Sequence, residues 1–548
     1  MKKYSRKILL SAVILMLIWG FFPQLQVQAA VKTGTMGTND GFTWSYDDKN
    51  KVLTFTGRDS GLEKEGLYTE SGTQYRRSPF YGIDKQIKKI IVKDCTIIGD
   101  ASYLFDELEE LESITFENFD TSKVTNMTSM FSECGSLTSL DVSGFDTAQV
   151  KLMSTMFYDC SMLTELNLSG FNTANVECMG GMFQGCVNLT SLDVSKFNTK
   201  NVSNMMSMFT ECNALTALDV SGFDTSKVRD MRYMFLGCRA LSKLDLSGFV
   251  TSKVMYMGCM FNGCKSLTTL DLSGFDTEGT WEMVDMFRGC SGLKKLNLAG
   301  FDTKGVEIDG MLYGCSALTT IYTPQKMEEG QTLSLGKTFY DTENTKWTSI
   351  SAKNTDRILC TTQMVFADVE PFSWQYDPAQ YVYSKNIMVG KDTDDKGKII
   401  FDPNANMTRA EFVQTLYNKE KKPSVKVSEN LFLDVKSTDW YAKAVTWATN
   451  KGIVSGKGDK FGVSDNITRE EVATILYNYA KYKKLSTKKT QDFTGYTDAD
   501  QISSWAVERM QWALAYGIMK GKGDRLDPKG NATRAECATM IKNFIDAY

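Results

Sequence analysis

The stretch LDVSGFDTSKVRDMRYMFLGC, residues 218–238, decides the fold because the chain repeats it. The same pattern returns as LDVSGFDTAQVKLMSTMFYDC at residues 140–160 and as LDLSGFVTSKVMYMGCMFNGC at residues 244–264. Its last cysteine recurs every 26 residues, and after 25 in the final copy, at Cys134, Cys160, Cys186, Cys212, Cys238, Cys264, Cys290 and Cys315. A fixed period of this length indicates a solenoid, because one repeat alone cannot bury its apolar face. The pattern predicts such a solenoid over residues 99–323.

Each copy divides into two parts. LTALDV, residues 215–220, has the L-x-x-L-x-L spacing in which alternate residues face the core, so these segments predict a ladder of parallel strands. In DTSKVRDMRYMF, residues 224–235, apolar residues follow at intervals of three and four, which predicts a short helix with one buried stripe. Thr225, like its equivalents from Thr121 to Thr303, stands at the start of that helix and is its predicted N-cap.

The repeated cysteines and methionines each allow two interpretations. Cysteines of adjacent coils could form disulfides, but the first coil carries Leu108 at this position, which favours buried free thiols. The methionines could form a soft-metal site, but Ile308 takes their place in the last coil, which favours core packing. The methionines concerned are Met127, Met153, Met205 and Met231 with their equivalents. We therefore predict no metal site and no cofactor.

An acidic row occupies the outward position of each predicted strand. Its carboxylates are candidates for a ligand-binding surface on the concave face, because like charges about 5 Å apart repel and a cation or basic ligand would relieve that. The alternative is local hydrogen bonding of each Asp to the serine–glycine turn that follows it. The row consists of Asp141, Asp193, Asp219, Asp245 and Asp271, with Asn167 and Asn297 in the same register.

The C-terminal third contains three copies of a different unit, which open with FADV, FLDV and YTDA. MTRAE, ITREE and ATRAE close the copies, and in each the Thr and Glu predict a capping box at the start of a helix. The arginine beside each cap stands at a helix N-terminus, where free N–H groups already favour an anion, so we predict anion binding by Arg409, Arg469 and Arg534. The tryptophans could stack on sugar rings, with core packing as the alternative, at Trp374, Trp440 and Trp505.

Composition excludes several classes of function. The 548-residue chain has no histidine, which excludes Ser-His-Asp and Cys-His catalysis and every histidine-ligated metal site. Its net charge of −4, with both signs mixed, argues against a nucleic-acid partner. At the N-terminus, four basic residues and an apolar run from Ile8 to Phe22 predict a signal peptide over residues 1–29, with a retained membrane anchor as the alternative. After cleavage we expect no membrane span.

The repeat, with the consensus LDLSGFDTSKV followed by M-x-x-M-F, resembles the BspA-like leucine-rich-repeat surface proteins of bacteria. That resemblance implies a parallel-β leucine-rich-repeat solenoid of the α/β class. Residues 30–98 and 324–364 resemble the N-terminal β-hairpin module and the C-terminal β cap of that family. It also implies a role in adhesion or ligand binding and no catalysis.

Residues 365–548 resemble three S-layer-homology repeats, at about 366–418, 432–480 and 496–545. This resemblance implies a mostly α-helical module with pseudo-threefold symmetry. It also implies non-covalent binding to a secondary cell-wall polymer, an acidic glycan of a Gram-positive envelope. The first copy departs from the pattern through the insertion DTDDKGKI, which resembles a calcium loop but carries Lys396 and Pro403 at ligand positions.

Together these features predict a multidomain protein secreted to the cell wall, which presents a solenoid for adhesion or for an unknown protein or glycan ligand. Two other functions stay open. One is a structural component of a surface lattice. The other is a wall-anchored glycan hydrolase that uses the acidic row, although carboxylate catalysis needs a pocket and one raised pKa.

Overall fold

A computed structural model describes residues 31–36, 40–60, 67–70, 73–76, 78–427 and 431–548 of the chain. The predicted signal peptide lies outside these residues. The chain divides into two compact units. One contains the described residues up to Phe339 together with Lys346–Thr361, and the other contains Tyr340–Thr345 and Thr362–Tyr548. Among the described residues, none of the helices has the length and apolar character that a membrane crossing requires.

The first unit begins with a sheet of order β1-β2-β3-β6-β7. The first three strands form an antiparallel meander, and β6 and β7 then add in parallel, so the sheet leads from the hairpins into the solenoid. Its strands are β1 (Val31–Met36), β2 (Phe42–Asp47), β3 (Val52–Ser60), β6 (Lys89–Asp100) and β7 (Ser113–Asn126). A separate hairpin of β4 (Leu67–Glu70) and β5 (Thr73–Arg76), and a 3-10 turn η2 (Asp84–Gln86), connect β3 to β6.

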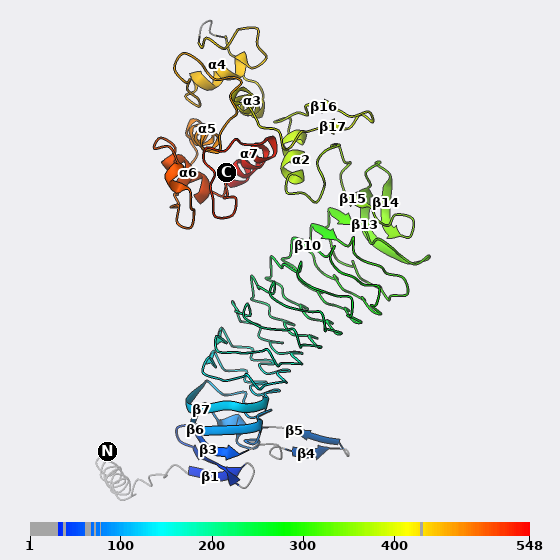
Figure 1. Ribbon diagram of the computed structural model, residues 1–548, viewed down its shortest axis with the longest axis vertical. Helices are drawn as coiled ribbons and strands as arrows, with labels where there is room; N and C mark the ends of the chain where they lie inside the picture. The colour runs from blue at the N-terminus through cyan, green and yellow to red at the C-terminus, as the bar shows by residue number, and fades with distance from the viewer. Residues whose placement is uncertain (1–30, 37–39, 61–66, 71–72, 77, 428–430) are drawn as a thin grey trace, which may run out of the picture. The chain divides into compact units, whose positions relative to one another are not determined.

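The repeats wind into a β-solenoid of about nine turns, drawn as stacked coils beyond β7 in Figure 1. The predicted strand ladder forms only in part. Parallel pairs appear at both ends, and a single bridge between Ala217 and Lys243 represents them in the middle. These short strands are β8 (Ser139–Asp141), β9 (Glu165–Asn167), β10 (Thr269–Asp271), β11 (Lys295–Asn297) and β12 (Thr320–Tyr322).

The predicted short helix in each repeat is wrong. Residues 99–323, all of which are described, contain no helix. The segment after each turn instead runs in parallel with its neighbours and is joined to them by single bridges, such as that between Asp230 and Tyr256. Every second backbone N–H then donates to a carbonyl of the next coil, for example from Met257 to Glu282 at 3.0 Å. A helix would direct those N–H groups into its own turn, so stacking between coils replaces it.

The predicted N-cap threonines therefore have another role. The Thr277 hydroxyl donates to the carbonyl of Asp302 in the next coil at 2.8 Å and accepts from the Asp302 backbone N–H at 2.9 Å. All eight threonines of this column donate to the coil that follows. Their side chains are buried. The repeated threonine thus ties neighbouring coils together.

The solenoid core consists of stacked columns of identical residues. Phenylalanines from Phe105 to Phe287 form a continuous stack, with ring centroids of successive coils 5.5 to 5.8 Å apart. The methionine stripe is buried beside them, which confirms core packing. The eight cysteines of the repeat column are free and buried, as predicted, and each of their thiols donates to a phenylalanine carbonyl, as Cys212 does to Phe183 at 3.2 Å.

A β-rich segment follows the last coil. Strand β12 pairs with β15 (Ile358–Cys360) in antiparallel fashion, and the sheet continues in the order β10-β11-β12-β15-β13-β14. Strands β13 (Thr332–Tyr340) and β14 (Lys346–Ser351) complete it.

The second unit consists of three two-helix copies that close into a ring. In each contact, the first helix of one copy packs against the second helix of the preceding copy: α4 on α3, α6 on α5 and α2 on α7. The helices are α2 (Tyr376–Ser384), α3 (Arg409–Lys419), α4 (Ala442–Asn450), α5 (Arg469–Tyr482), α6 (Val507–Ala515) and α7 (Arg534–Ala547), with a 3-10 turn η3 (Ala499–Gln501). The insertion in the first copy forms the hairpin β16 (Asp392–Thr393) and β17 (Ile399–Ile400).

Candidate functional site

The second helix of each of the three copies begins with a capping box, as predicted. In α5, the Thr468 hydroxyl accepts from the backbone N–H of Glu471, and the Glu471 carboxylate accepts from the backbone N–H of Thr468. The same reciprocal pair opens α3 and α7. The caps fix the first turn of each helix and therefore fix the direction of the arginine that follows the threonine.

Each of these arginines crosses to the next copy. Arg409 donates to the carbonyls of Phe461 at 3.1 Å and Ser455 at 3.2 Å, and to the Glu471 carboxylate at 2.9 Å. Arg469 makes the corresponding contacts with the third copy, and Arg534 donates to backbone carbonyls of the first. The same arginine contact thus recurs at each of the three junctions between copies.

The structure places all three arginines in the interior, each 4% to 6% exposed. Burial is the leading influence on Arg534, and it lowers the pKa of that guanidinium despite the opposing charge of Glu411. Each arginine has its donors directed at backbone carbonyls or a glutamate. The arginines therefore hold the loop of the neighbouring copy in place and form the floor of a groove.

The groove above Arg409 has a cavity volume of about 420 Å³. One wall is the loop at residues 453–457, and the other is one face of α5, from which Glu471 and Asn478 line the cavity. Trp505, from the third copy, completes it. Residues of all three copies thus meet in one groove, which we call the second groove.

An equivalent first groove lies between the loop at residues 387–391 and α3, with Trp440 from the second copy and Arg534 from the third. Its cavity volume is about 130 Å³. The inserted hairpin borders this loop closely, because a Cβ atom on Gly390 would lie 2.2 Å from Cγ2 of Ile399. The copy that carries the inserted hairpin is thus the copy with the smaller groove.

Each copy has a lysine beside its capping box, and two of these lysines, Lys391 and Lys457, line the two grooves. Lys391, Lys457 and Lys522 each follow a glycine in the loop and pair with a capping-box glutamate, at distances of 2.6, 3.2 and 2.9 Å. Burial opposes ionisation of Glu411, but the bond from Lys391 and the other cationic and N–H groups outweigh it and lower the pKa of Glu411. A glycine–lysine pair at the same place in every copy is the signal that could have identified them.

The tryptophans of the second unit form two sets, one exposed and one buried. Trp374, Trp440 and Trp505 are 59%, 62% and 49% exposed, so the alternative of core packing does not apply to them. Trp447 and Trp512 on α4 and α6 are buried instead. An exposed indole ring beside a cationic groove has its apolar face free for a ligand.

The acidic row of the solenoid is exposed, with each carboxylate in the predicted local contact. The backbone N–H of the serine two residues later donates to the aspartate, for example from Ser221 to Asp219 at 3.0 Å. The Ser221 hydroxyl donates to the same carboxylate at 2.7 Å, and these two bonds lower the pKa of Asp219 although Asp193 and Asp245 oppose this. The hydrogen bonds to the turn are sufficient to account for an aspartate at this position of each repeat. The row nevertheless presents acidic side chains to solvent.

Two family profiles match the chain. One, described as "Mycoplasma protein of unknown function, DUF285", matches residues 77–191, 161–268 and 240–352, which together cover half of the chain. The chain belongs to the DUF285 family. The other, the S-layer homology domain, matches residues 365–413, 431–473 and 495–538. The predicted BspA-like repeats and three S-layer-homology (SLH) repeats are confirmed.

Curated relatives share part of this DUF285 chain. The S-layer protein sap of Bacillus anthracis is 29% identical over 32% of the chain and 20% of that protein. The cellulosome-anchoring protein of Acetivibrio thermocellus is 28% identical over 27% of the chain and 34% of that protein. An amylopullulanase of Thermoanaerobacterium thermosulfurigenes is 34% identical over 33% of the chain and 9% of that enzyme, and this match lies in the SLH region. The chain thus spans about a third or less of each relative.

These similarities indicate a cell-surface protein that is associated with the cell wall. Among solved structures, the TLR13–ssRNA13 complex matches 46% of the chain and 48% of that protein, at 14% identity and a TM-score of 0.15. That similarity is too low to assign the solenoid to the leucine-rich-repeat type. The described residues contain no cluster of three or more Cys, Asp or Glu side chains placed to hold a metal ion.

Proposed function

We propose that residues 365–548 anchor the protein to an anionic secondary polymer of a Gram-positive cell wall, and that the solenoid presents a ligand-binding surface. The observation that carries the anchoring proposal is the meeting of Trp505, Lys457 and Arg409 in one groove. An indole face packs against the apolar face of a sugar ring, and a lysine at the rim attracts an acidic substituent. The groove thus combines the two contacts that an acidic glycan needs.

Electrostatics separates the roles within the groove. Lys457 is about half exposed, so its attraction for an anion is screened by salt. Arg409 is buried and committed to three acceptors, so its contribution to the ligand is a positive field and a fixed floor. Polymer binding that depends on Lys457 should therefore weaken as the salt concentration rises.

Co-sedimentation with cell-wall sacculi tests the anchor. The full chain is mixed with sacculi that keep their secondary polymer and with sacculi from which acid has removed it. We expect binding to the first only. Equal binding to both, or binding to neither, would refute the proposal.

For the solenoid we propose the leucine-rich-repeat type and a role in adhesion, with residues 99–323 as the repeat region. Its candidate surface is the acidic row from Asp141 to Asp271. Hydrogen bonds from the serine turns lower the pKa of four of its members, Asp141, Asp193, Asp219 and Asp245. The fitting ligand is a basic protein segment or a cationic glycan. Loss of ligand capture in an Asp219→Asn, Asp245→Asn double variant would support this surface, and unchanged capture would remove it.

A structural role in a surface lattice is the second candidate, because several relatives are themselves named S-layer proteins. Small-angle scattering of the full chain distinguishes the lattice role from the anchoring role. Concentration-dependent growth into sheets favours the lattice, and a monomer at all concentrations favours the anchor with a presented solenoid. The amylopullulanase matches only the SLH region, which gives a glycan hydrolase no support.

A further inference from the structure

The coils of the solenoid are joined by a repeating set of backbone hydrogen bonds. In the eighth coil, the N–H groups of four alternate residues donate to carbonyls of the last coil at 2.8 to 3.0 Å. The donors are Met283, Asp285, Phe287 and Gly289, and the acceptors are Glu307, Asp309, Met311 and Tyr313. The same four-bond set joins the seventh coil to the eighth. Each coil therefore presents four N–H donors to whatever lies next.

The last coil presents the same four donors with no further coil to accept them. They are the N–H groups of Ile308, Gly310, Leu312 and Gly314, and within the described part of the chain none of them has a hydrogen-bond acceptor. Unpaired N–H groups of this kind are unusual in a folded protein and favour an added acceptor.

The β-rich segment that follows the last coil makes hydrogen bonds at the two ends of this row of N–H groups, but its described residues make none in the middle. At one end, the Gln331 side-chain amide donates to the carbonyls of Thr303 at 2.8 Å and Val306 at 2.9 Å. At the other end, the Lys337 ammonium donates to the carbonyl of Ser316 at 2.9 Å. Between these two contacts, β13 passes over the coil and borders a half-open cavity of about 580 Å³.

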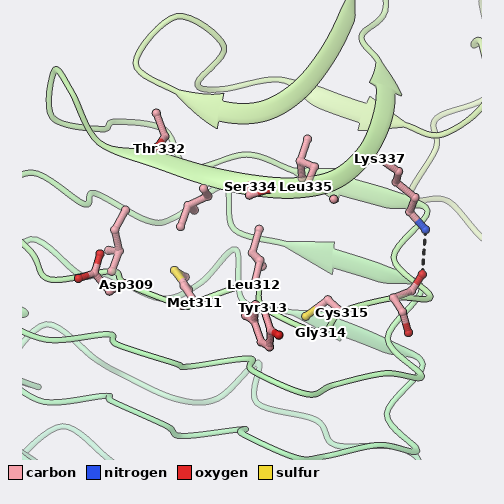
Figure 2. Close-up of a pocket in the computed structure, with 15 residues that line it drawn as sticks. Asp309, Met311, Leu312, Tyr313, Gly314, Cys315, Thr332, Ser334, Leu335 and Lys337 are labelled. Atoms are coloured by element: carbon pink, nitrogen blue, oxygen red, sulfur yellow. Dashed lines mark hydrogen bonds between the residues drawn. The ribbon is translucent and has the colours of Figure 1, made fainter.

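Figure 2 shows this cavity between the coil and β13, with Leu312 directed toward the strand and Tyr313 directed away from it. The lining includes Met311, Leu333 and Leu335. Leu312 occupies the place of the stacked phenylalanines, 25 residues after Phe287, so the aromatic column ends at the cavity floor. The next position of that column is the space below β13.

We propose that this cavity is a peptide-binding site, in which a segment of a partner protein takes the place of a further coil. The peptide accepts hydrogen bonds from the four free N–H groups through carbonyls at every second residue. Its apolar side chain lies on Leu312 and continues the column. The coils have left-handed backbone at Asp285 and Gly289, so a fitting peptide carries Gly, Asn or Asp at those two positions.

A peptide with the sequence of one segment of the solenoid serves as the probe for binding. The peptide EMVDMFRG, residues 282–289 of the chain, makes these four bonds with the seventh coil and places its Phe on Phe261. We would measure hydrogen–deuterium exchange of the full chain with and without this peptide. In the free chain, the four open amides should exchange quickly, and the four bonded amides of residues 283–289 serve as the slow internal control. Peptide at about ten times its dissociation constant should slow exchange at residues 308–314 about tenfold.

Two matched comparisons make the test specific. The peptide with Phe287→Ser keeps its carbonyls but loses the apolar contact, and the chain variant Leu312→Ala loses the same contact from the other side. Each should weaken binding about tenfold, whereas Trp281→Ala, whose side chain is 61% exposed and does not line the cavity, should bind as the unaltered chain does. Slow exchange in the free chain, no slowing with peptide, protection on the acidic row instead, or equal loss in Trp281→Ala would overturn the proposal.

Discussion

Arg409 of the first SLH copy lies 2.9 Å from the carboxylate of Glu471, which caps the helix of the second copy. The same glutamate lies 3.2 Å from the groove lysine, Lys457. One carboxylate therefore joins a buried arginine that builds the floor to an exposed lysine at the rim. Stability and ligand binding are coupled at this residue, so variants of the groove must be chosen to separate the two.

Arg409→Ala should destabilise the SLH module by about 3 kcal/mol, because it leaves two backbone carbonyls and part of a buried carboxylate without their donor. Urea unfolding of the full chain, followed through tryptophan fluorescence, measures this. Arg409→Lys is the control, since a lysine keeps the charge but cannot reach three acceptors, and it should recover only a small part of the loss. Full recovery with lysine would show that charge alone matters.

The stability of the module should fall in acid through Glu411. Its pKa is lower in the folded chain than in the unfolded chain, so its stabilising effect is complete above the unfolded pKa of about 4.3 and is lost as the pH falls through the folded pKa. Thermal unfolding between pH 6 and pH 3 measures the effect. Glu411→Gln should be less stable at pH 6 and should lose less stability on acidification. Parallel pH curves for both proteins would contradict this.

Thr277→Val should destabilise the solenoid by about 2 kcal/mol, because the hydroxyl bonds to the buried Asp302 backbone are lost at nearly constant volume. Thr277→Ser keeps the hydroxyl and should cost less. Thr277→Asp distinguishes this role from a helix cap, since aspartate serves well as a cap but would bury a charge here. Near-native stability of the aspartate variant in denaturant unfolding would favour the cap.

Most cysteines should resist alkylation in the folded chain. Burial raises the pKa of Cys186 and Cys238 to about 12, and a buried thiol that stays protonated is a poor nucleophile. Cys178 and Cys259 are partly exposed and should react first with iodoacetamide at pH 8. Peptide mass spectrometry before and after denaturation measures this. Disulfide-linked peptides from neighbouring coils would contradict the stacked free thiols.

Periodicity predicted much of the fold, because a 26-residue repeat defines which positions are buried in every coil. It failed for the segment of residues 224–235, where intervals of three and four suggested a helix. Met231, Met234 and Phe235 do face the core, but they reach it from backbone that bonds to the next coil. Single-repeat patterns do not contain that information, since the competing hydrogen bonds come from a neighbour.

The candidate site was predicted only in outline. The capping boxes depend on a local spacing and were predicted correctly, whereas the burial of Arg409 depends on carbonyls 46 to 52 residues away. The role of Trp505 as the wall of a groove built by other copies depends on the closure of the ring. The pair Gly456-Lys457 has an equivalent in every copy, but its place beside a groove follows only from the fold.

Binding of Trp505→Ala to polymer-bearing sacculi, with Trp281→Ala as control, tests the anchoring account most directly. Both indoles are exposed, at 49% and 61%, but Trp281 lies in the solenoid. We expect Trp505→Ala to bind about tenfold more weakly, equal to about 1.4 kcal/mol, with unchanged circular dichroism, while Trp281→Ala binds as the unaltered chain does. Equal binding of all three proteins, or equal loss in both variants, would contradict the groove as the site of attachment.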